Sequence, residues 1–314
     1  MMTVRKKTIR RLLVVAVVAV IVAVLNSGGA GAQPELPGGG VAGTGTDAQG
    51  EQSKQVVLGF YLDVLAANRL DRVRDYLAED YVQHSPGLPG TVDGYLKTYA
   101  QLHDTFPDLL ARIDKIVAHG DKVMMLNTFR GTHKQSGRQL DFETAELYRV
   151  ADGKIVEHWD AVDYAAMDEL GVVFPRGEQP STATNWTGTE QQRQNLGRLF
   201  LTIDSLYAHP EAPVRGFLAK DVIQHTRGLG HGLLDFKQNL IGYRERFPDL
   251  TMQVTHTVAD NDNVVVFWYW KGHEKDTGEE LVLNRADVFR VAGGQFVEHW
   301  SRIDYRAANP FGLK

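Results

Sequence analysis

One stretch of the chain occurs twice, and this repeat constrains the fold more than any other feature of the sequence. The segment Ile155–Asp163 recurs as Phe296–Asp304 with its Val-Glu-His-Trp core unchanged. The shared histidines lie 299 − 158 = 141 residues apart, and the same offset relates His84 to His225 without a gap. A period this long exceeds the roughly 20–50 residues of solenoid repeats, so we expect each copy to be a domain with its own core.

Length and composition agree with two globular domains. The chain has 314 residues, of which 43% are hydrophobic and 23% charged, and domains of about 100–150 residues are typical. A net charge of −5 without basic clusters argues against a nucleic-acid partner. The chain contains no cysteine, which excludes thiolate catalysis, disulfides and cysteine-ligated zinc.

The N-terminus has the layout of a secretory signal peptide. Basic residues up to Arg11 precede an apolar run from Leu12 to Leu25, and small residues follow up to Ala32. The run is short for a bilayer span, so we predict a signal peptide over residues 1–32 and a secreted or cell-envelope protein. The alternative is an uncleaved anchor that attaches the protein to a membrane with its domains outside.

The remaining segments are assigned from composition and from the repeat. Residues 33–50 are rich in Gly, Ala, Pro and Thr and predict a flexible linker. Domain one is expected over 51–170, a second linker over 171–188, and domain two over 189–314.

Each copy reads as helices followed by strands. Val57, Phe60, Tyr61, Val64 and Leu65 form one helix face, a short helix is expected over 70–77 (214–218 in domain two), and a third ends at Phe106. Period-two runs then predict strands at 113–117, 122–129, 143–150 and 154–162, with a hairpin turn at 152–153. Helices followed by an antiparallel meander give an α+β fold with helices on one face of a curved sheet.

This order of elements, with certain short segments, resembles the SnoaL-like polyketide cyclase group of the NTF2-like superfamily. The segments that carry the resemblance are Tyr81–His84, Phe106–Asp108, Gly120–Val123, Gly131–His133 and Tyr148–Asp160. The resemblance covers both copies, from about Glu51 to Asp163 and from about Glu190 to Asp304.

The resemblance implies two tandem cone-shaped barrels, each with a pocket, that work without metal or cofactor. In the founding cyclases an aspartate of the closing strand is the acid/base of an aldol ring closure, and its position corresponds to Asp160. Domain two has Ser301 at the equivalent position, so the resemblance implies this chemistry for domain one only.

Alternation along the closing strand supports a site around Asp160 independently of the family. Val156, His158, Asp160 and Val162 should share one face, with Ile155 and Trp159 on the other. In an apolar cavity Asp160 could exchange a proton with a carbon acid, with His158 as donor or proton partner. The alternative for His158 is a structural role, because its repeat His299 persists beside Ser301.

Four further residues are candidates for lining a pocket. They are Tyr81 and His84 in domain one and His225 and His299 in domain two. The first two belong to the segment Tyr81–His84, and the other two are the repeat positions of His84 and His158. We read His84 and His225 as following a helix at a turn, where a histidine can instead cap backbone carbonyls.

The sequence therefore predicts an exported protein whose first domain is a cofactor-free cyclase, isomerase or hydrolase for a small apolar carbonyl compound. No metal-ligand or nucleotide motif is present. The alternative is a non-catalytic secreted module that binds a small hydrophobic molecule or has a structural role. The two domains are expected to pair within one chain, because the aromatic run 267–270 cannot hide both faces in one core, and further self-association stays open.

Overall fold

The computed structural model describes residues 47–85, 88–172, 192, 194–199, 217–260, 262–308 and 311. The predicted signal peptide and most of both predicted linkers lie outside these residues. Within the described part of the chain, no helix is long and apolar enough to cross a membrane.

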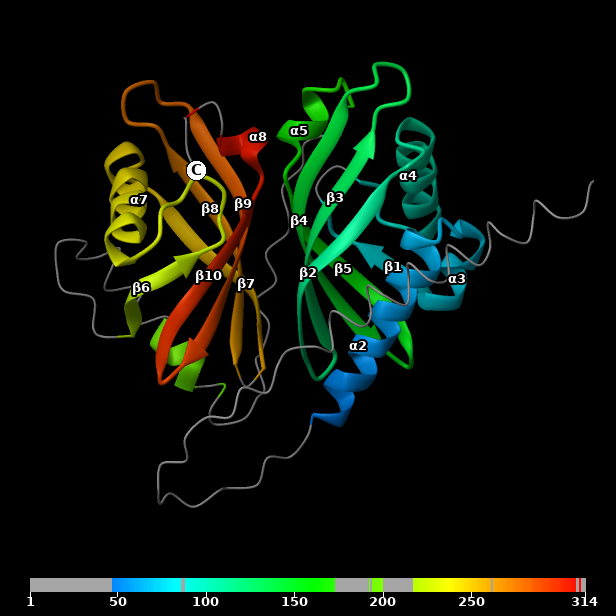
Figure 1. Cartoon of the computed structure of the whole chain (residues 1–314), viewed down its shortest axis with the longest axis horizontal. Helices are drawn as coiled ribbons and strands as arrows, with labels where there is room; N and C mark the ends of the chain where they lie inside the picture. The colour runs from blue at the N-terminus through cyan, green and yellow to red at the C-terminus, as the bar shows by residue number, and fades with distance from the viewer. Residues whose placement is uncertain are drawn as a thin grey trace, which may run out of the picture. The chain divides into compact units, whose positions relative to one another are not determined.

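Domain one contains helices and strands in the expected order (Figure 1). The elements are α2 (Ala48–Phe60), a π-helical continuation (Tyr61–Ala66), a 3-10 turn (Leu70–Arg72), α3 (Val73–Tyr76), β1 (Leu77–Gln83), α4 (Val92–Thr105), β2 (Leu110–His119), β3 (Lys122–Thr132), β4 (Gln139–Ala151), β5 (Lys154–Val162) and α5 (Ala165–Asp168). Helix α2 begins slightly before the expected boundary at Glu51, because the Asp47 side chain caps it by accepting from the Gly50 amide at 2.8 Å.

Domain two repeats this order at the same offset. Its elements are β6 (Leu218–Gln224), α7 (Leu233–Arg246), β7 (Thr251–Ala259), β8 (Asn263–His273), β9 (Glu280–Ala292), β10 (Gln295–Ile303) and α8 (Tyr305–Ala308). β8 begins 263 − 122 = 141 residues after β3. Residues 194–199 are helical, and the predicted helix at 214–218 lies outside the described residues except for its last two. The expected α+β fold of two tandem domains is confirmed.

Each domain has one five-stranded sheet, in which the predicted four-stranded antiparallel meander is confirmed and one further strand is added. The strand orders are β1-β5-β4-β3-β2 and β6-β10-β9-β8-β7. The first strand of each domain was not predicted, and it pairs in parallel with the last strand. His84 therefore follows a strand, not a helix, and its amide donates to the His158 carbonyl at 2.8 Å. The same correction applies to His225, whose amide donates to His299.

The hairpin between β4 and β5 has the expected turn and an unexpected bulge. Asp152 and Gly153 have φ of 50° and 73°, as a two-residue turn with left-handed residues requires. Beyond the turn, the pairing shifts between Val150 and Arg149, so that Arg149 lies opposite Glu157 and Glu146 opposite Asp160. The bulge places Ile155, rather than the predicted Val156, in the domain core.

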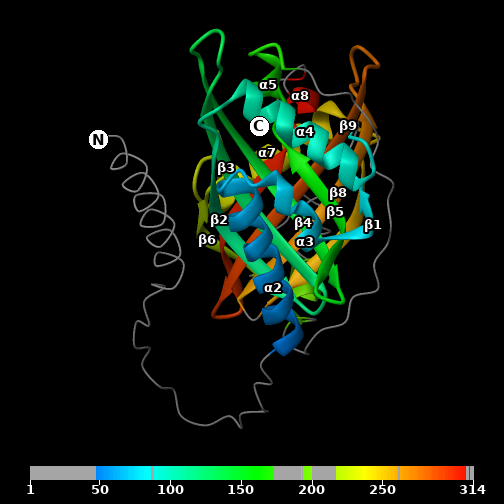
Figure 2. The ribbon, with the colours of Figure 1, turned by 90° about the vertical axis from the view of Figure 1, so that its right-hand side faces the viewer.

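The helices cover one face of each sheet and leave the other face to a further apolar cluster. Figure 2 shows α2 and α4 in front of the first sheet, and Phe60, Tyr95 and Phe106 fill the space between them and the strands. The opposite faces of both sheets contribute to one shared cluster (Val117, Met124, Leu126, Ala145, Leu147, Trp159, Ala161, Val258, Val265, Phe267, Ala286 and Val288). Phe267 belongs to it, whereas Trp268 and Trp270 belong to the core of domain two, as alternation along β8 dictates.

Candidate active site

A narrow cavity lies inside domain one, between the sheet and α4. It holds about 50 Å³, roughly the space of a few water molecules. Residues of β1, α4, β3, β4, β5 and α5, with Leu88 and Tyr164 from the connecting segments, line it: Gln83, Leu88, Thr98, Tyr99, Leu102, Phe129, Phe142, Thr144, Glu146, His158, Asp160, Val162, Tyr164 and Met167. Most of this surface is apolar, and the polar groups converge from β1, β4 and β5.

His158 is held at both ring nitrogens. Its Nδ1 lies 2.6 Å from Oε1 of Gln83 and its Nε2 lies 2.7 Å from Oε2 of Glu146. The ring also stacks on Tyr148 with centroids 4.6 Å apart. With the Gln83 oxygen toward the ring, both ring nitrogens face acceptor oxygens to which they can donate. His158 is therefore fixed in position, and both of its ring nitrogens are already engaged.

Glu146 is a buried carboxylate that the sequence reasoning did not identify. It accepts from Thr144 Oγ1 at 2.9 Å and from the Tyr148 hydroxyl at 3.1 Å, in addition to His158. Burial acts to raise its pKa, but the hydrogen bonds and the charge of His158 bring the pKa below its ordinary value. Glu146 therefore stays ionised and forms a buried ion pair with His158.

Asp160 lies next to this ion pair and is in the opposite electrostatic situation. Its side chain is buried and accepts a hydrogen bond from Ser85 Oγ. Burial raises the pKa of Asp160 to about 6, and the nearby charge of Glu146 adds to the shift while His158 opposes it. A carboxyl group with such a pKa exchanges its proton readily near neutral pH, as a general acid/base must.

The two carboxylates and the histidine thus form one set with divided roles. Glu146 and Asp160 face each other across β4 and β5, and their surroundings move their pKa values in opposite directions, a pattern that separates an ionised group from a proton-exchanging one. The cavity wall carries two acidic side chains and only one histidine, which makes it unfavourable for an anionic ligand. A neutral ligand fits this environment better.

The structure brings together some of the predicted site residues and separates others. His158 and Asp160 line the cavity, as alternation predicted. The Tyr81 hydroxyl lies behind this lining and donates to Gln83 Oε1 at 3.0 Å. His84 lies on the other face of the sheet, stacked on Trp159 at 4.6 Å with its Nε2 3.0 Å from Glu157.

The two candidates in domain two are arranged in the same way. His225 stacks on Trp300 at 4.3 Å and lies 3.0 Å from Glu298. His299 is fully buried, with Nδ1 2.6 Å from Gln224 and Nε2 3.0 Å from Asp287. Asp287 therefore orients His299, as Glu146 orients His158 in domain one.

The interior of domain two differs from the cavity at two equivalent positions. Arg285 replaces Thr144, and its Nε donates to both oxygens of Asp287 at 2.9 Å. Trp270 replaces Phe129, and the Arg285 guanidinium lies 4.8 Å from its ring centroid. Both side chains are larger than those at the equivalent positions of domain one, and both are buried. Among the described residues, no group of three or more His, Asp or Glu is arranged to hold a metal ion.

Each domain is thus a five-stranded sheet with helices on one face. The chain belongs to the SnoaL-like polyketide cyclase family, whose model matches residues 55–169 and 201–309. The two matched regions correspond to the two domains.

Solved structures similar to this chain include several of the same description. IdmH, a putative polyketide cyclase from Streptomyces antibioticus, is 32% identical over 38% of this chain and 99% of its own, with a TM-score of 0.35. A putative polyketide cyclase from Acidithiobacillus ferrooxidans is 26% identical over 38% of this chain and 93% of its own, with a TM-score of 0.35. No curated protein matches the chain.

Proposed function

We propose that domain one performs cofactor-free acid–base chemistry on a small neutral carbonyl compound, as a cyclase, isomerase or hydrolase. The observation that carries this proposal is Asp160, a buried carboxyl group on the cavity wall with a pKa of about 6. Membership of the polyketide cyclase family supports the same class of chemistry. Domain two has Ser301 at this position and contributes no acid/base of its own.

The proposed reaction uses the lining residues in distinct roles. The Asp160 carboxylate takes a proton from the carbon next to the substrate carbonyl, which leaves an enolate, and returns the proton to the product. The Glu146–His158 ion pair positions β5 and places a positive charge beside the developing anion. The Tyr99 hydroxyl, which lines the same cavity, is a donor available to the enolate oxygen.

Proton exchange at carbon tests this proposal before the natural substrate is known. A panel of small neutral 1,3-dicarbonyl compounds is incubated in D2O, and deuterium incorporation at the central carbon is followed by NMR. Asp160→Asn should reduce the enzymatic exchange at least about 1,000-fold, because the amide cannot accept the proton. Ser301→Ala is the matched control and should keep full exchange.

Other outcomes would decide against catalysis. Equal exchange by wild type and Asp160→Asn would refute the role of Asp160. A compound bound equally well by both proteins, with no exchange by either, would favour the non-catalytic binding module.

We also propose that the protein is exported and cleaved after Ala32. The support is the basic, apolar and small-residue order of residues 1–32. N-terminal sequencing of protein from the medium or envelope should find Gln33 first. A product that retains Met1 in the membrane fraction would instead mean an anchored protein.

Finally, we propose that the two domains form an intramolecular pseudo-dimer. In support, His256 of domain two lies 4.4 Å from the Trp159 ring, and Lys115 of domain one lies 4.2 Å from the Trp300 ring. Both pairs of positions are related by the repeat, since 256 − 115 and 300 − 159 both equal 141. Reciprocal contacts of this kind are typical of a two-fold interface.

A further inference from the structure

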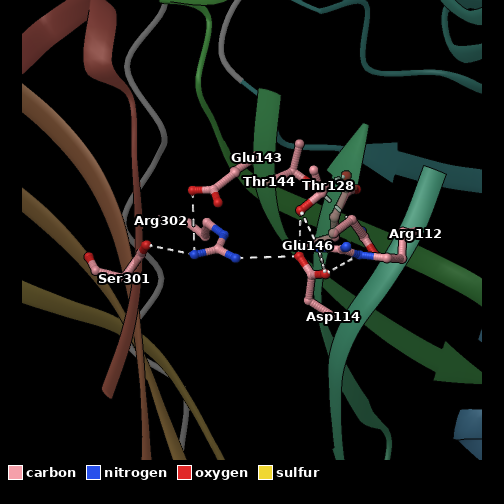
Figure 3. Close-up of polar contacts among 9 residues, drawn as sticks. Arg112, Asp114, Thr128, Glu143, Thr144, Glu146, Ser301 and Arg302 are labelled. Carbon is pink, nitrogen blue, oxygen red and sulfur yellow. Dashed lines mark hydrogen bonds and ion pairs between the residues drawn. The ribbon is translucent and has the colours of Figure 1, made fainter. Parts of the chain in front are cut away.

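Arg302 of domain two is buried against acids of domain one. Figure 3 shows its guanidinium between Glu143 and Asp114, at 3.5 Å from Glu143 Oε2 through Nη1 and 3.4 Å from Asp114 Oδ2 through Nη2. Only 4% of the Arg302 side chain is exposed. A guanidinium removed from water to this extent depends on nearby carboxylates for its stability.

The repeat makes this contact one-sided. The position of Arg302 corresponds to Ala161 in domain one, and the positions of Asp114 and Glu143 correspond to Thr255 and Asn284 in domain two. The reciprocal contact therefore has no charge on either side. The contacts on the two tryptophans instead recur in both halves, through His256 and Lys115.

A further ion pair also joins an arginine of domain two to an acid of domain one. Arg227 of domain two lies 3.6 Å from Asp163, whose side chain is 3% exposed. The repeat position of Arg227 is Pro86, so domain one again lacks the cation. In each of these ion pairs domain two supplies the arginine and domain one supplies the acid.

We infer that these one-sided charges select the partner of each domain, so that domain one pairs with domain two and neither pairs with its own kind. This inference rests on the proposed pairing. If two copies of domain two paired in the same way, Arg302 would face Thr255 and Asn284 and remain buried without a counter-charge. If two copies of domain one did so, Glu143 and Asp114 would face Ala161. The first arrangement buries an uncompensated arginine, which is strongly unfavourable. The second leaves Glu143 without Arg302, although Asp114 keeps its ion pair with Arg112.

A charge swap in the full-length chain tests this selection. Arg302→Glu should lower the Tm by at least about 5 °C, because it places like charges together in a buried contact. Arg302→Glu combined with Glu143→Arg restores opposite charges across the interface and should recover most of the loss. The matched control combines Arg302→Glu with Asn284→Arg, which places the new arginine at the equivalent position of domain two and should recover little.

The outcomes separate the selection from the pairing itself. The selection is refuted if both double variants have the same Tm, or if Arg302→Glu lowers the Tm no more than Arg130→Glu at an exposed pair. Dimers formed only by Arg302→Glu/Asn284→Arg would support it, since that variant carries both charges on domain two. Val265→Asp tests pairing separately: an unchanged Tm would mean that the shared apolar cluster does not hold the domains together.

Discussion

The interiors of the two domains hold the same histidine in two different electrostatic settings. In domain one His158 bonds Glu146 while Asp160 faces the cavity, whereas in domain two His299 bonds Asp287, which is shared with Arg285. The acid partner of the histidine is thus present in both copies. Asp160, by contrast, has no acidic counterpart in domain two, where the repeat position is Ser301.

The comparison predicts that the largest loss of stability will follow from removing a buried charge of domain two. Asp287→Ala should lower the free energy of unfolding by about 3–5 kcal/mol, because Arg285 and His299 lose the carboxylate that compensates them. Denaturant unfolding of the full chain measures the effect. Glu280→Ala, at an exposed pair with Lys271, is the control and should cost less than about 1 kcal/mol. Equal costs would show that the buried cluster is not essential to domain two.

In domain one the buried acid should act against stability. The folded-state pKa of Asp160 is about 6, against an ordinary value of 3.8. Its contribution to stability is therefore complete below about pH 4 and is lost as the pH rises through 6. Asp160→Asn should stabilise the chain by up to about 3 kcal/mol above pH 7, and this gain should disappear at pH 4. A stability difference that does not change with pH would contradict the shifted pKa.

A single substitution should also make the interior of domain one resemble that of domain two. Thr144→Arg introduces the domain-two side chain into the cavity, where Glu146 can pair with it as Asp287 pairs with Arg285. We expect ligand affinity or proton exchange to fall about 100-fold, equivalent to about 2.7 kcal/mol, because the cavity is filled. Gln139→Arg, at the exposed end of the same strand, is the control. Unchanged binding in Thr144→Arg would place the ligand elsewhere.

The smallest effect is expected at the position that separates the two copies. Ser301 Oγ is buried and makes no hydrogen bond among the described atoms. Ser301→Ala removes an unsatisfied hydroxyl and should change the free energy of unfolding by less than about 1 kcal/mol, in the stabilising direction. A clear loss of stability by thermal unfolding would reveal a role for this hydroxyl.

Local patterns were sufficient to predict most of this fold. Alternation predicted β2 to β5, and the gap-free repeat transferred each strand to domain two. β1 was missed because Leu77 to Gln83 buries only Leu77, Tyr81 and Gln83, and because parallel pairing with the distant β5 leaves no local signal.

Of the residues that line the cavity, the sequence predicted only those of β5. Alternation placed His158 and Asp160 on one face, but a plain two-residue hairpin would have put Glu146 opposite Trp159. The bulge at Val156 shifts the register of β5 by one residue and brings His158 and Asp160 to the face of Glu146. The repeat held a usable signal, because residues 146 and 287 are both acidic. His84 was misplaced because its strand was missed.

The tandem arrangement also determines how the proposed pair responds to dilution. Two separate subunits come apart when their concentration falls below the dissociation constant. Two domains in one chain instead meet at an effective concentration in the millimolar range, whatever the volume around them. With the proposed export, the two domains of one chain would therefore stay paired at any dilution.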